Sequence, residues 1–72
     1  MPREEAIEAE GRVVEVLAGS IFRVEMPNGH LLLAHLSGKM RREFVRVESG
    51  DKVTVEMTPF DFSKGRIVSR KQ

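Results

Sequence analysis

The 72-residue chain contains no cysteine, no tryptophan and no tyrosine. The absence of cysteine excludes disulfides, thiolate metal sites and thiol nucleophiles, and it fits a reducing compartment. A domain of this size buries only about 60% of the surface that its unfolded chain exposes, so the core has little to spare. We therefore expect a single domain over residues 1–72 that is held together by packing alone.

Long apolar segments are also missing. No apolar run approaches the roughly 20 residues needed to cross a bilayer. Residues 1–10 hold four glutamates and one arginine, whereas a signal peptide would begin with basic residues. We expect a cytoplasmic protein without membrane contact, in which residues 1–6 form a flexible arm because chain termini are mobile unless tied down.

Groups that could carry catalysis are few. His30 and His35 have no third ligand at a useful spacing, so a metal site is not expected. Asp61 is typical of a turn residue, no serine has a paired base, and no glycine pattern forms a phosphate loop. The sequence predicts a binding protein with no enzymatic activity and no cofactor.

Charge is segregated along the chain although the net charge is only +1. Residues 37–46 hold four basic side chains and one acidic side chain, and residues 63–72 hold four basic side chains and none that is acidic. Such clusters create a local positive field that steers phosphate-bearing partners. Two solvated basic loops are the alternative interpretation.

Short segments of alternating apolar and polar residues predict five β-strands. We expect them at residues 7–17, 21–26, 31–36, 52–57 and 66–70, with a loop over residues 58–65 before the last strand. In the first strand the inward positions change phase after Val13, so that Val14 and Val16 turn inward. A phase change near Gly11 predicts a bulged strand shared by two sheets of a small barrel.

The second and third strands are predicted to form a hairpin. Asn28-Gly29 favours a type I′ turn, because both residues accept a positive φ. This turn would place three pairs opposite each other: Met26 with Leu31, Val24 with Leu33, and Phe22 with His35. Because three leucines are consecutive, a one-residue slip would still bury an apolar side chain.

A short helix is predicted over residues 38–45. Ser37 is suited to the N-cap, and Met40, Phe44 and Val47 recur at the spacing of one apolar stripe. Five strands with this helical turn between the third and fourth predict an all-β, five-stranded Greek-key barrel of the OB-fold type, in which the second and third strands bind oligonucleotides. An SH3-like barrel is the alternative, and the helix favours the OB-fold.

The basic segment is the first candidate site. Lys39, Arg41 and Arg42 lie off the apolar stripe and can point outward. A guanidinium group can bond a phosphate with two N–H groups and stack on a base. Five other side chains could either pack or contact RNA: Phe22, His35, Met40, Phe60 and Phe62. Packing in the barrel is favoured for Phe22, and packing against the barrel end is favoured for Phe60 and Phe62.

Several segments match one known family. EGRVVEVL, FRVEMPNGH, AHLSGKMR, GDKVTVEMTP and KGRIV occur in the order found in bacterial translation initiation factor 1, after an acidic start and without a gap. The sequence therefore resembles this family from end to end. The family departs from this chain mainly at Glu48, where it has an apolar residue, and at Phe60 and Ser69, where tyrosine is common.

The resemblance implies an S1-like OB-fold protein that binds the small ribosomal subunit at its aminoacyl (decoding) site, next to a ribosomal protein. Such factors are not enzymes. They stabilise binding of the other two initiation factors, block premature entry of elongator tRNA and leave when the large subunit joins. We expect a monomer off the ribosome.

The resemblance also assigns residues. In the family, the loop and helical turn after the third strand enter the minor groove of the decoding helix and hold two adenosines flipped out. The SGKMR segment would take this role here, with Arg46 reaching a phosphate. The full set of candidate RNA-binding residues is Ser37, Gly38, Lys39, Met40, Arg41, Arg42, Arg46, Lys64, Gly65, Arg66, Arg70, Phe22, Arg23 and His35.

Two other functions are kept as alternatives. One is a sequence-tolerant RNA chaperone of the cold-shock type, for which the second and third strands supply only Phe22 as an aromatic. The other is a protein-interaction barrel that uses Leu31 to Leu33 as an apolar patch.

Overall fold

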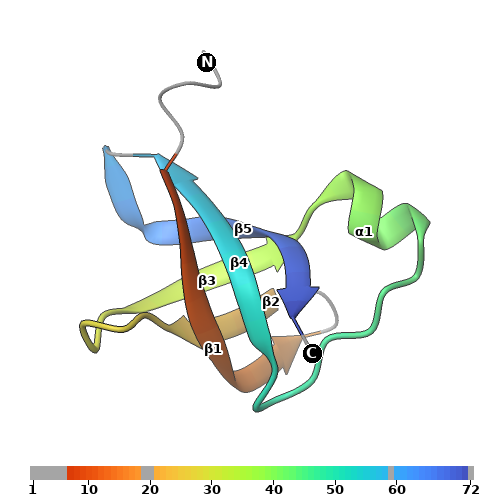
Figure 1. The fold of residues 1–72 in the computed structure, drawn as a ribbon, viewed down its shortest axis with the longest axis horizontal. Helices are drawn as coiled ribbons and strands as arrows, with labels where there is room; N and C mark the ends of the chain where they lie inside the picture. Colours follow the sequence, from red (N-terminus) through yellow and green to blue (C-terminus); the bar gives the residue numbers. More distant parts are fainter. Residues whose placement is uncertain (1–6, 19–20, 59, 72) are drawn as a thin grey trace.

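A computed structural model describes residues 7–18, 21–58 and 60–71. Five strands close into a barrel in the order β1-β2-β3-β5-β4 (Figure 1). They are β1 (Ile7–Ala18), β2 (Ile21–Glu25), β3 (Leu31–Leu36), β4 (Lys52–Thr58) and β5 (Asp61–Lys71), with the short helix α1 (Gly38–Arg42) between β3 and β4. The predicted OB-fold barrel is confirmed. The predicted arm at residues 1–6 lies outside the described residues.

Apolar side chains that alternate along the strands fill the barrel. Val13, Val24, Val53, Val55 and Ile67 are completely inaccessible to solvent. The rest of the core consists of Phe22, Met26, Leu32, Ala34, Met40, Val47 and Met57. No helix in the part of the chain that the structure describes is long and apolar enough to cross a membrane.

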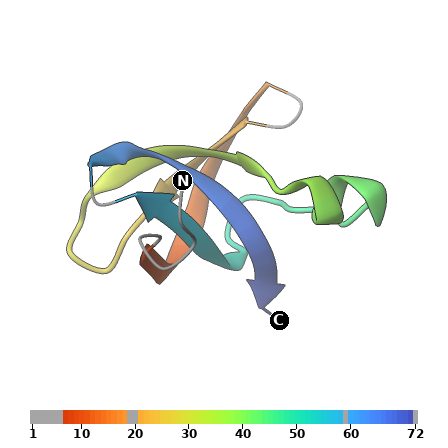
Figure 2. The same ribbon diagram turned by 90° about the horizontal axis from the view of Figure 1, so that it is seen from above.

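The first strand is shared between two neighbours, as its phase change predicted. Its first half pairs with β4 and its second half with β2, and the register with β2 shifts between Val13 and Glu15. Val14 and Val16 are nevertheless exposed, so the prediction that they turn inward was wrong. Val13 remains the inward residue, and beyond it the end of β1 projects from the barrel together with β2 (Figure 2).

The turn of the β2–β3 hairpin is longer than predicted. The Met26 N–H donates to the His30 carbonyl over 2.8 Å, and the Gly29 N–H donates to the Met26 carbonyl over 2.8 Å. The connection therefore has three residues, and Gly29 has a φ of 86° while Asn28 is not in the left-handed region. A type I′ turn at Asn28-Gly29 was the wrong prediction.

The longer turn displaces the predicted pairing of the two strands by one residue. Phe22 lies opposite Ala34 instead of His35, and the other two predicted pairs are displaced in the same way. Leu32 and Ala34 are buried, whereas Leu33 and His35 are exposed. The sequence could not distinguish this register from the predicted one, because leucine occupies both faces of β3.

The last strand begins at Asp61 and not at residue 66, so the prediction of a loop over residues 58–65 was wrong. Thr58 already pairs with Asp61 in a tight β4–β5 connection. Residues 64–67 pair with β3, and much of the strand also pairs with β4. A Cβ on Gly65 would lie 2.6 Å from Val55 Cγ1 and 3.2 Å from the Glu56 carbonyl oxygen. Gly65 thus lets β5 lie close to β4 while it pairs with β3.

Gly65→Ala should lower the free energy of unfolding by about 1 to 3 kcal/mol, because the added methyl group would push against backbone and core atoms. Urea unfolding of the full chain measures this. Gly38→Ala is the matched control, because the nearest atom to its added Cβ is Arg42 Nη1 at 3.6 Å. Equal stability of the two variants would contradict the close approach at Gly65.

Asp61 begins β5 with a carboxylate that is already bonded. Hydrogen bonds from the Ser63 hydroxyl and N–H lower the pKa of Asp61. The folded state therefore favours the ionised carboxylate. Its contribution to the free energy of unfolding is fully present above the ordinary pKa of 3.8 and is lost as the pH falls through the lowered pKa of the folded state.

Asp61→Asn mimics the protonated form. Its urea midpoint should lie below that of the unchanged chain at about pH 6 and converge with it towards about pH 2.5. A difference that is independent of pH would contradict this.

Candidate nucleic-acid interface

The segment after β3 is attached to the barrel by backbone and side chain. The Ser37 N–H donates to the Ile67 carbonyl over 2.9 Å, and the Ser37 hydroxyl accepts the Met40 N–H over 3.3 Å. Ser37 is therefore the N-cap that the sequence predicted. Met40 is only 4% exposed and packs in the core, so one face of α1 is anchored and the other faces solvent.

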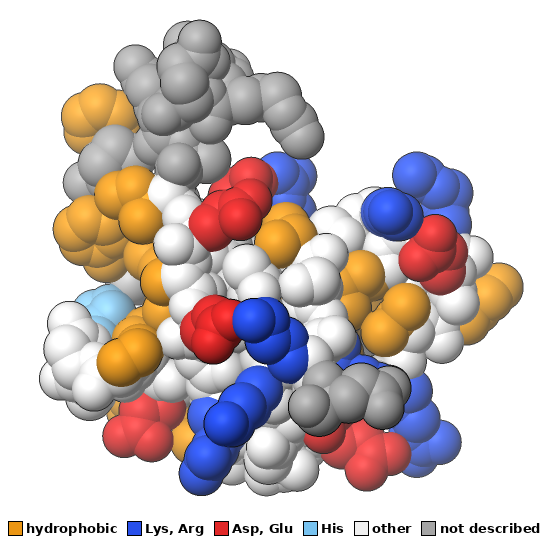
Figure 3. All heavy atoms as spheres, in the orientation of Figure 1, with side chains coloured by type: hydrophobic (Ala, Val, Ile, Leu, Met, Phe, Trp, Pro, Cys, Tyr) orange, Lys and Arg blue, Asp and Glu red, His pale blue; other side chains and the backbone are white. Residues whose placement is uncertain are grey.

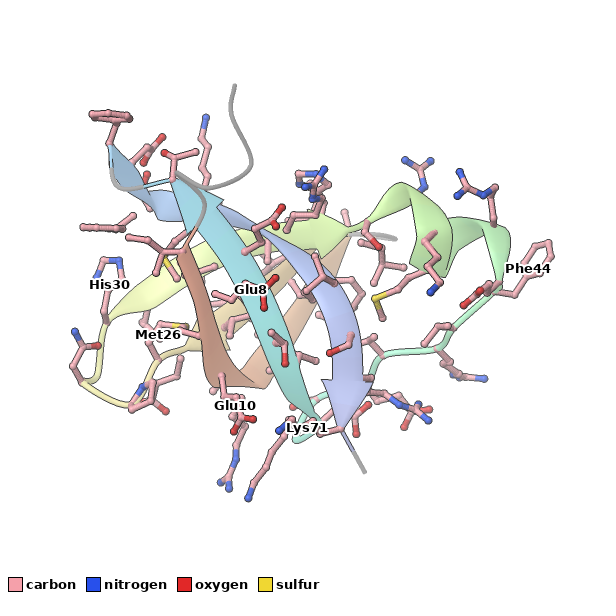
Figure 4. The ribbon with its side chains drawn as sticks, turned by 45° about the horizontal axis from the view of Figure 1, so that its top comes forward. Glu8, Glu10, Met26, His30, Phe44 and Lys71 are labelled. Carbon is pink, nitrogen blue, oxygen red and sulfur yellow. The ribbon has the colours of Figure 1, made fainter. Side chains whose placement is uncertain are left out.

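The helix ends three residues earlier than predicted. Phe44 has a φ of 56°, its N–H donates to the Arg41 carbonyl over 3.2 Å, and the Val45 N–H donates to the Met40 carbonyl over 3.1 Å. This is the Schellman arrangement that ends many helices. The Phe44 ring is 90% exposed and points away from the barrel (Figure 4). The prediction that Phe44 packs in one stripe with Met40 and Val47 was wrong.

Three cations project from α1 without carboxylate partners. Lys39, Arg41 and Arg42 are exposed, and none of the five ion pairs found among the described residues includes them. The helix protrudes from the side of the barrel, and Figure 3 shows Lys and Arg side chains gathered on this protrusion. Gly38 opens the helix beside them and is also exposed. The segment therefore presents concentrated positive charge to solvent.

A second pair of candidate arginines lies where the chain after α1 meets the end of β5. Arg70 Nη1 donates to the Arg46 carbonyl over 2.5 Å and lies 3.9 Å from Asp51. Arg46 Nε lies 3.0 Å from Glu48, and both side chains are largely exposed. Surface ion pairs of this kind contribute about 1 kcal/mol or less. A phosphate could therefore compete for Arg46.

Four further candidates share the outer face of β2, β3 and β5. His35 lies beside Arg66 across the β3–β5 pairing, and Leu33 lies between Arg23 and Lys64. Arg66 forms an ion pair with Glu56, and Arg23 forms one with Glu15 at 2.7 Å. Lys64 takes no part in the ion pairs of the described residues. This face is basic, with exposed leucines between the charges.

Other predicted site residues support the surface from within. Phe22 is 3% exposed, and Met40 and Ser37 are also buried, so Phe22 and Met40, whose roles the sequence left open, both pack in the core. Gly65 lies so close to Val55 that a Cβ at this position would not fit. Sequence reasoning missed Phe44 as a surface residue, because an aromatic at helical spacing is usually buried.

The two phenylalanines of the β4–β5 end differ from each other. Phe60 is 81% exposed, so the prediction that it packs against the barrel end was wrong. The Phe62 ring lines a hollow of about 390 Å³ with Met26 and Met57. His30 Nε2 donates to the Phe62 carbonyl over 2.6 Å, and this bond joins the β2–β3 turn to β5.

At the opposite end of β5 an acid and a base neutralise each other. Lys71 forms an ion pair with Glu10 of β1 (Figure 4). The hydrogen bond from Lys71 and its positive charge hold the pKa of Glu10 below the usual value. Lys71 is therefore less available to a polyanion than the cations of α1. The described residues contain no group of three or more His, Cys, Asp or Glu that could hold a metal ion.

Comparison with known proteins identifies similar chains. A family model described as "Translation initiation factor 1A / IF-1" matches residues 1–72. The solution structure of translation initiation factor 1 from the Wolbachia endosymbiont strain TRS of Brugia malayi is 41% identical, with a TM-score of 0.79 over 96% of this chain and 82% of that chain. The crystal structure of YjeQ from Thermotoga maritima is 27% identical, with a TM-score of 0.75 over 92% of this chain but 23% of that chain.

Ser37→Ala should lower the free energy of unfolding by about 1 kcal/mol, because the Met40 N–H loses its side-chain acceptor at the helix start. Ser37→Asp keeps an acceptor at this position and is the matched control. Chemical denaturation of both variants at neutral pH measures the effect. If Ser37→Ala were as stable as the unchanged chain, the cap would not be what holds α1 in place.

Proposed function

The chain belongs to the translation initiation factor 1A / IF-1 family, and from this premise we propose that it binds the small ribosomal subunit at the aminoacyl (decoding) site through ribosomal RNA. There it stabilises binding of the other two bacterial initiation factors, blocks premature entry of elongator tRNA and leaves when the large subunit joins. It acts in the cytoplasm as one domain, without catalysis, and touches a neighbouring ribosomal protein on the subunit.

The observation that carries this proposal is the set of unpaired cations on α1. Lys39, Arg41 and Arg42 have no carboxylate partner among the described residues. Each phosphate that such a cation neutralises releases counterions from the RNA, which favours binding at moderate salt. A cation already paired with a carboxylate would first have to break that pair. The strongest phosphate attraction is therefore expected at α1.

The attachment of α1 supports insertion into an RNA groove. The minor groove of an A-form helix is wide and shallow, so a protruding helical turn can enter it. The Ser37 cap and the buried Met40 hold α1 in one conformation before it binds. Less side-chain and backbone freedom is then lost on binding. Flipping a base out of its stack costs a few kcal/mol, which the contacts with α1 have to offset.

The remaining basic residues would extend the contact beyond the groove. Arg46 lies in the segment that connects α1 to β4, and Arg70 of β5 bonds to its carbonyl. Their positions suit contact with backbone phosphates of the same RNA helix. The outer face with Arg23, Lys64 and Arg66 offers a further surface for RNA or for the neighbouring ribosomal protein.

The two alternative functions receive less support. A cold-shock type of chaperone stacks bases on exposed aromatics of the second and third strands, but Phe22 is buried and the exposed large apolar residues of β2 and β3 are Ile21, Leu31 and Leu33. A protein-interaction barrel would use the same leucines, but Arg23 and Lys64 lie on both sides of Leu33. Both alternatives are outcomes of the following experiment.

Arg41→Ala should weaken binding to purified small ribosomal subunits about tenfold and leave the urea midpoint unchanged, because a charged hydrogen bond is lost from an exposed position. Fluorescently labelled full-length protein is titrated with subunits at two salt concentrations. Arg12→Ala is the matched control, because Arg12 is an exposed cation on β1 without an ion pair among the described residues.

Salt dependence together with competition by large subunits and unstructured RNA separates the three functions. The unchanged chain should lose affinity by roughly 0.7 to 0.9 log units per log unit of salt for each phosphate contact, and Arg41→Ala should show a smaller slope. Equal competition by large subunits or unstructured RNA would indicate a general RNA binder. Affinity that is insensitive to salt would indicate a protein-interaction barrel.

A further inference from the structure

Phe44 combines two features that the fold itself does not require. Its ring is 90% exposed, and its backbone has a φ of 56°. A non-glycine residue in the left-handed region is strained, and glycine is the usual residue at this position of a Schellman ending. A phenylalanine here therefore lowers stability through its backbone conformation, and its exposed ring gains no burial that would offset this cost.

The backbone bonds around Phe44 fix the direction in which its side chain leaves the chain. Its N–H donates to the Arg41 carbonyl, and the next residue, Val45, bonds back to Met40. Met40 is buried, so the turn that carries Phe44 is anchored to the core. The side chain thus leaves the backbone at the outer end of α1 and points away from the barrel (Figure 4).

The surroundings of the ring are cationic. Arg41 and Arg42 precede it and Arg46 follows it, with Glu43 as the acid of this stretch. An aromatic ring next to cations that bind phosphates is the combination that single-stranded nucleic-acid sites use, because the cations hold the backbone while the ring takes a base. An apolar ring alone would fit a protein pocket equally well, but its basic neighbours favour a polyanion.

We propose that Phe44 is a stacking platform for one unpaired base of the RNA that α1 contacts. This inference rests on the proposed function and adds a residue with its own mode of contact. The cations of α1 bind phosphates, whereas the Phe44 ring binds the face of a base through dispersion and π-stacking. Because every base has such a face, this contact does not read base identity through hydrogen bonds.

Phe44→Gly tests the proposal because its two effects have opposite signs. Glycine relieves the strained φ, so the Tm should rise by roughly 4 °C. Loss of the ring should weaken binding to purified small ribosomal subunits about tenfold, which is about 1.4 kcal/mol. A residue that served only the fold would not show higher stability together with weaker binding.

Salt dependence separates this contact from the phosphate contacts. The affinity lost in Phe44→Gly should be the same at low and high salt, because stacking releases no counterions. The affinity lost in Arg41→Ala should shrink as salt rises. Phe44→Leu distinguishes a base from a protein pocket. Leucine should bind as weakly as glycine if a base is stacked, whereas affinity restored by leucine would indicate an apolar protein pocket and overturn the proposal.

A direct readout is available because the chain contains no tryptophan and no tyrosine. In Phe44→Trp the single indole should be quenched when small subunits bind, and it should become protected from a soluble quencher. Phe60→Trp is the matched control, because Phe60 is 81% exposed and the β4–β5 end lies on the opposite side of the barrel from α1 (Figure 1). Its emission should not change.

The outcomes separate the two hypotheses. Weaker binding in Phe44→Gly with a raised Tm and a quenched indole at position 44 supports the proposal. Unchanged binding in Phe44→Gly, with weaker binding in Arg41→Ala, overturns the stacking role and leaves the proposed function intact. Unchanged binding in both variants overturns the proposed function. A lowered Tm in Phe44→Gly would show that Phe44 serves the fold, which overturns the premise of the inference.

Discussion

The double pairing of β5 is the constraint on which the rest of the structure depends. One strand has to bond β3 in parallel and β4 in antiparallel fashion to close the barrel. Gly65 allows the close approach to Val55 that this requires. The same strand offers the Ile67 carbonyl that accepts the Ser37 N–H. Barrel closure and the position of α1 are therefore parts of one arrangement.

Closure by β5 also determines which charges become neighbours. Arg66 is brought to Glu56, Lys71 to Glu10, and Arg70 to Asp51 and the Arg46 carbonyl. These contacts join residues far apart in the sequence, and they reduce the positive charge over the barrel. The helix α1 receives no such partner from the described strands. The molecule can thus have a net charge of +1 and still present a concentrated positive field at one protrusion.

The sequence was sufficient for features that depend on local chemistry. The Ser37 cap and the shared first strand follow from residue type and short-range spacing. The β2–β3 register was not predictable, because three leucines satisfy either face and Asn-Gly also occurs in a three-residue turn. The start of β5 was hidden by polar residues at 61, 63 and 64, which are typical of a loop but here are solvent-exposed residues of a strand. The ion pairs of Arg66, Arg70 and Lys71 depend on the position of β5 in the barrel, so no local pattern indicates them.

The position of Phe44 shows how the end of a helix decides the role of a residue. Met40 and Phe44 are four residues apart, and in a continuous helix both would lie on the buried face. The helix instead ends at Arg42, and the left-handed conformation at Phe44 turns the chain back towards Val47. The ring then points outward while Val47 still reaches the core. Helical periodicity predicts burial only for residues within the helix. An aromatic residue just beyond the last turn can therefore be exposed on the surface. Natural sequences break a local rule most often where the site gains from it. The exposed ring on a strained residue, beside arginines that take no part in the ion pairs of the described residues, is therefore the place for which we propose a function.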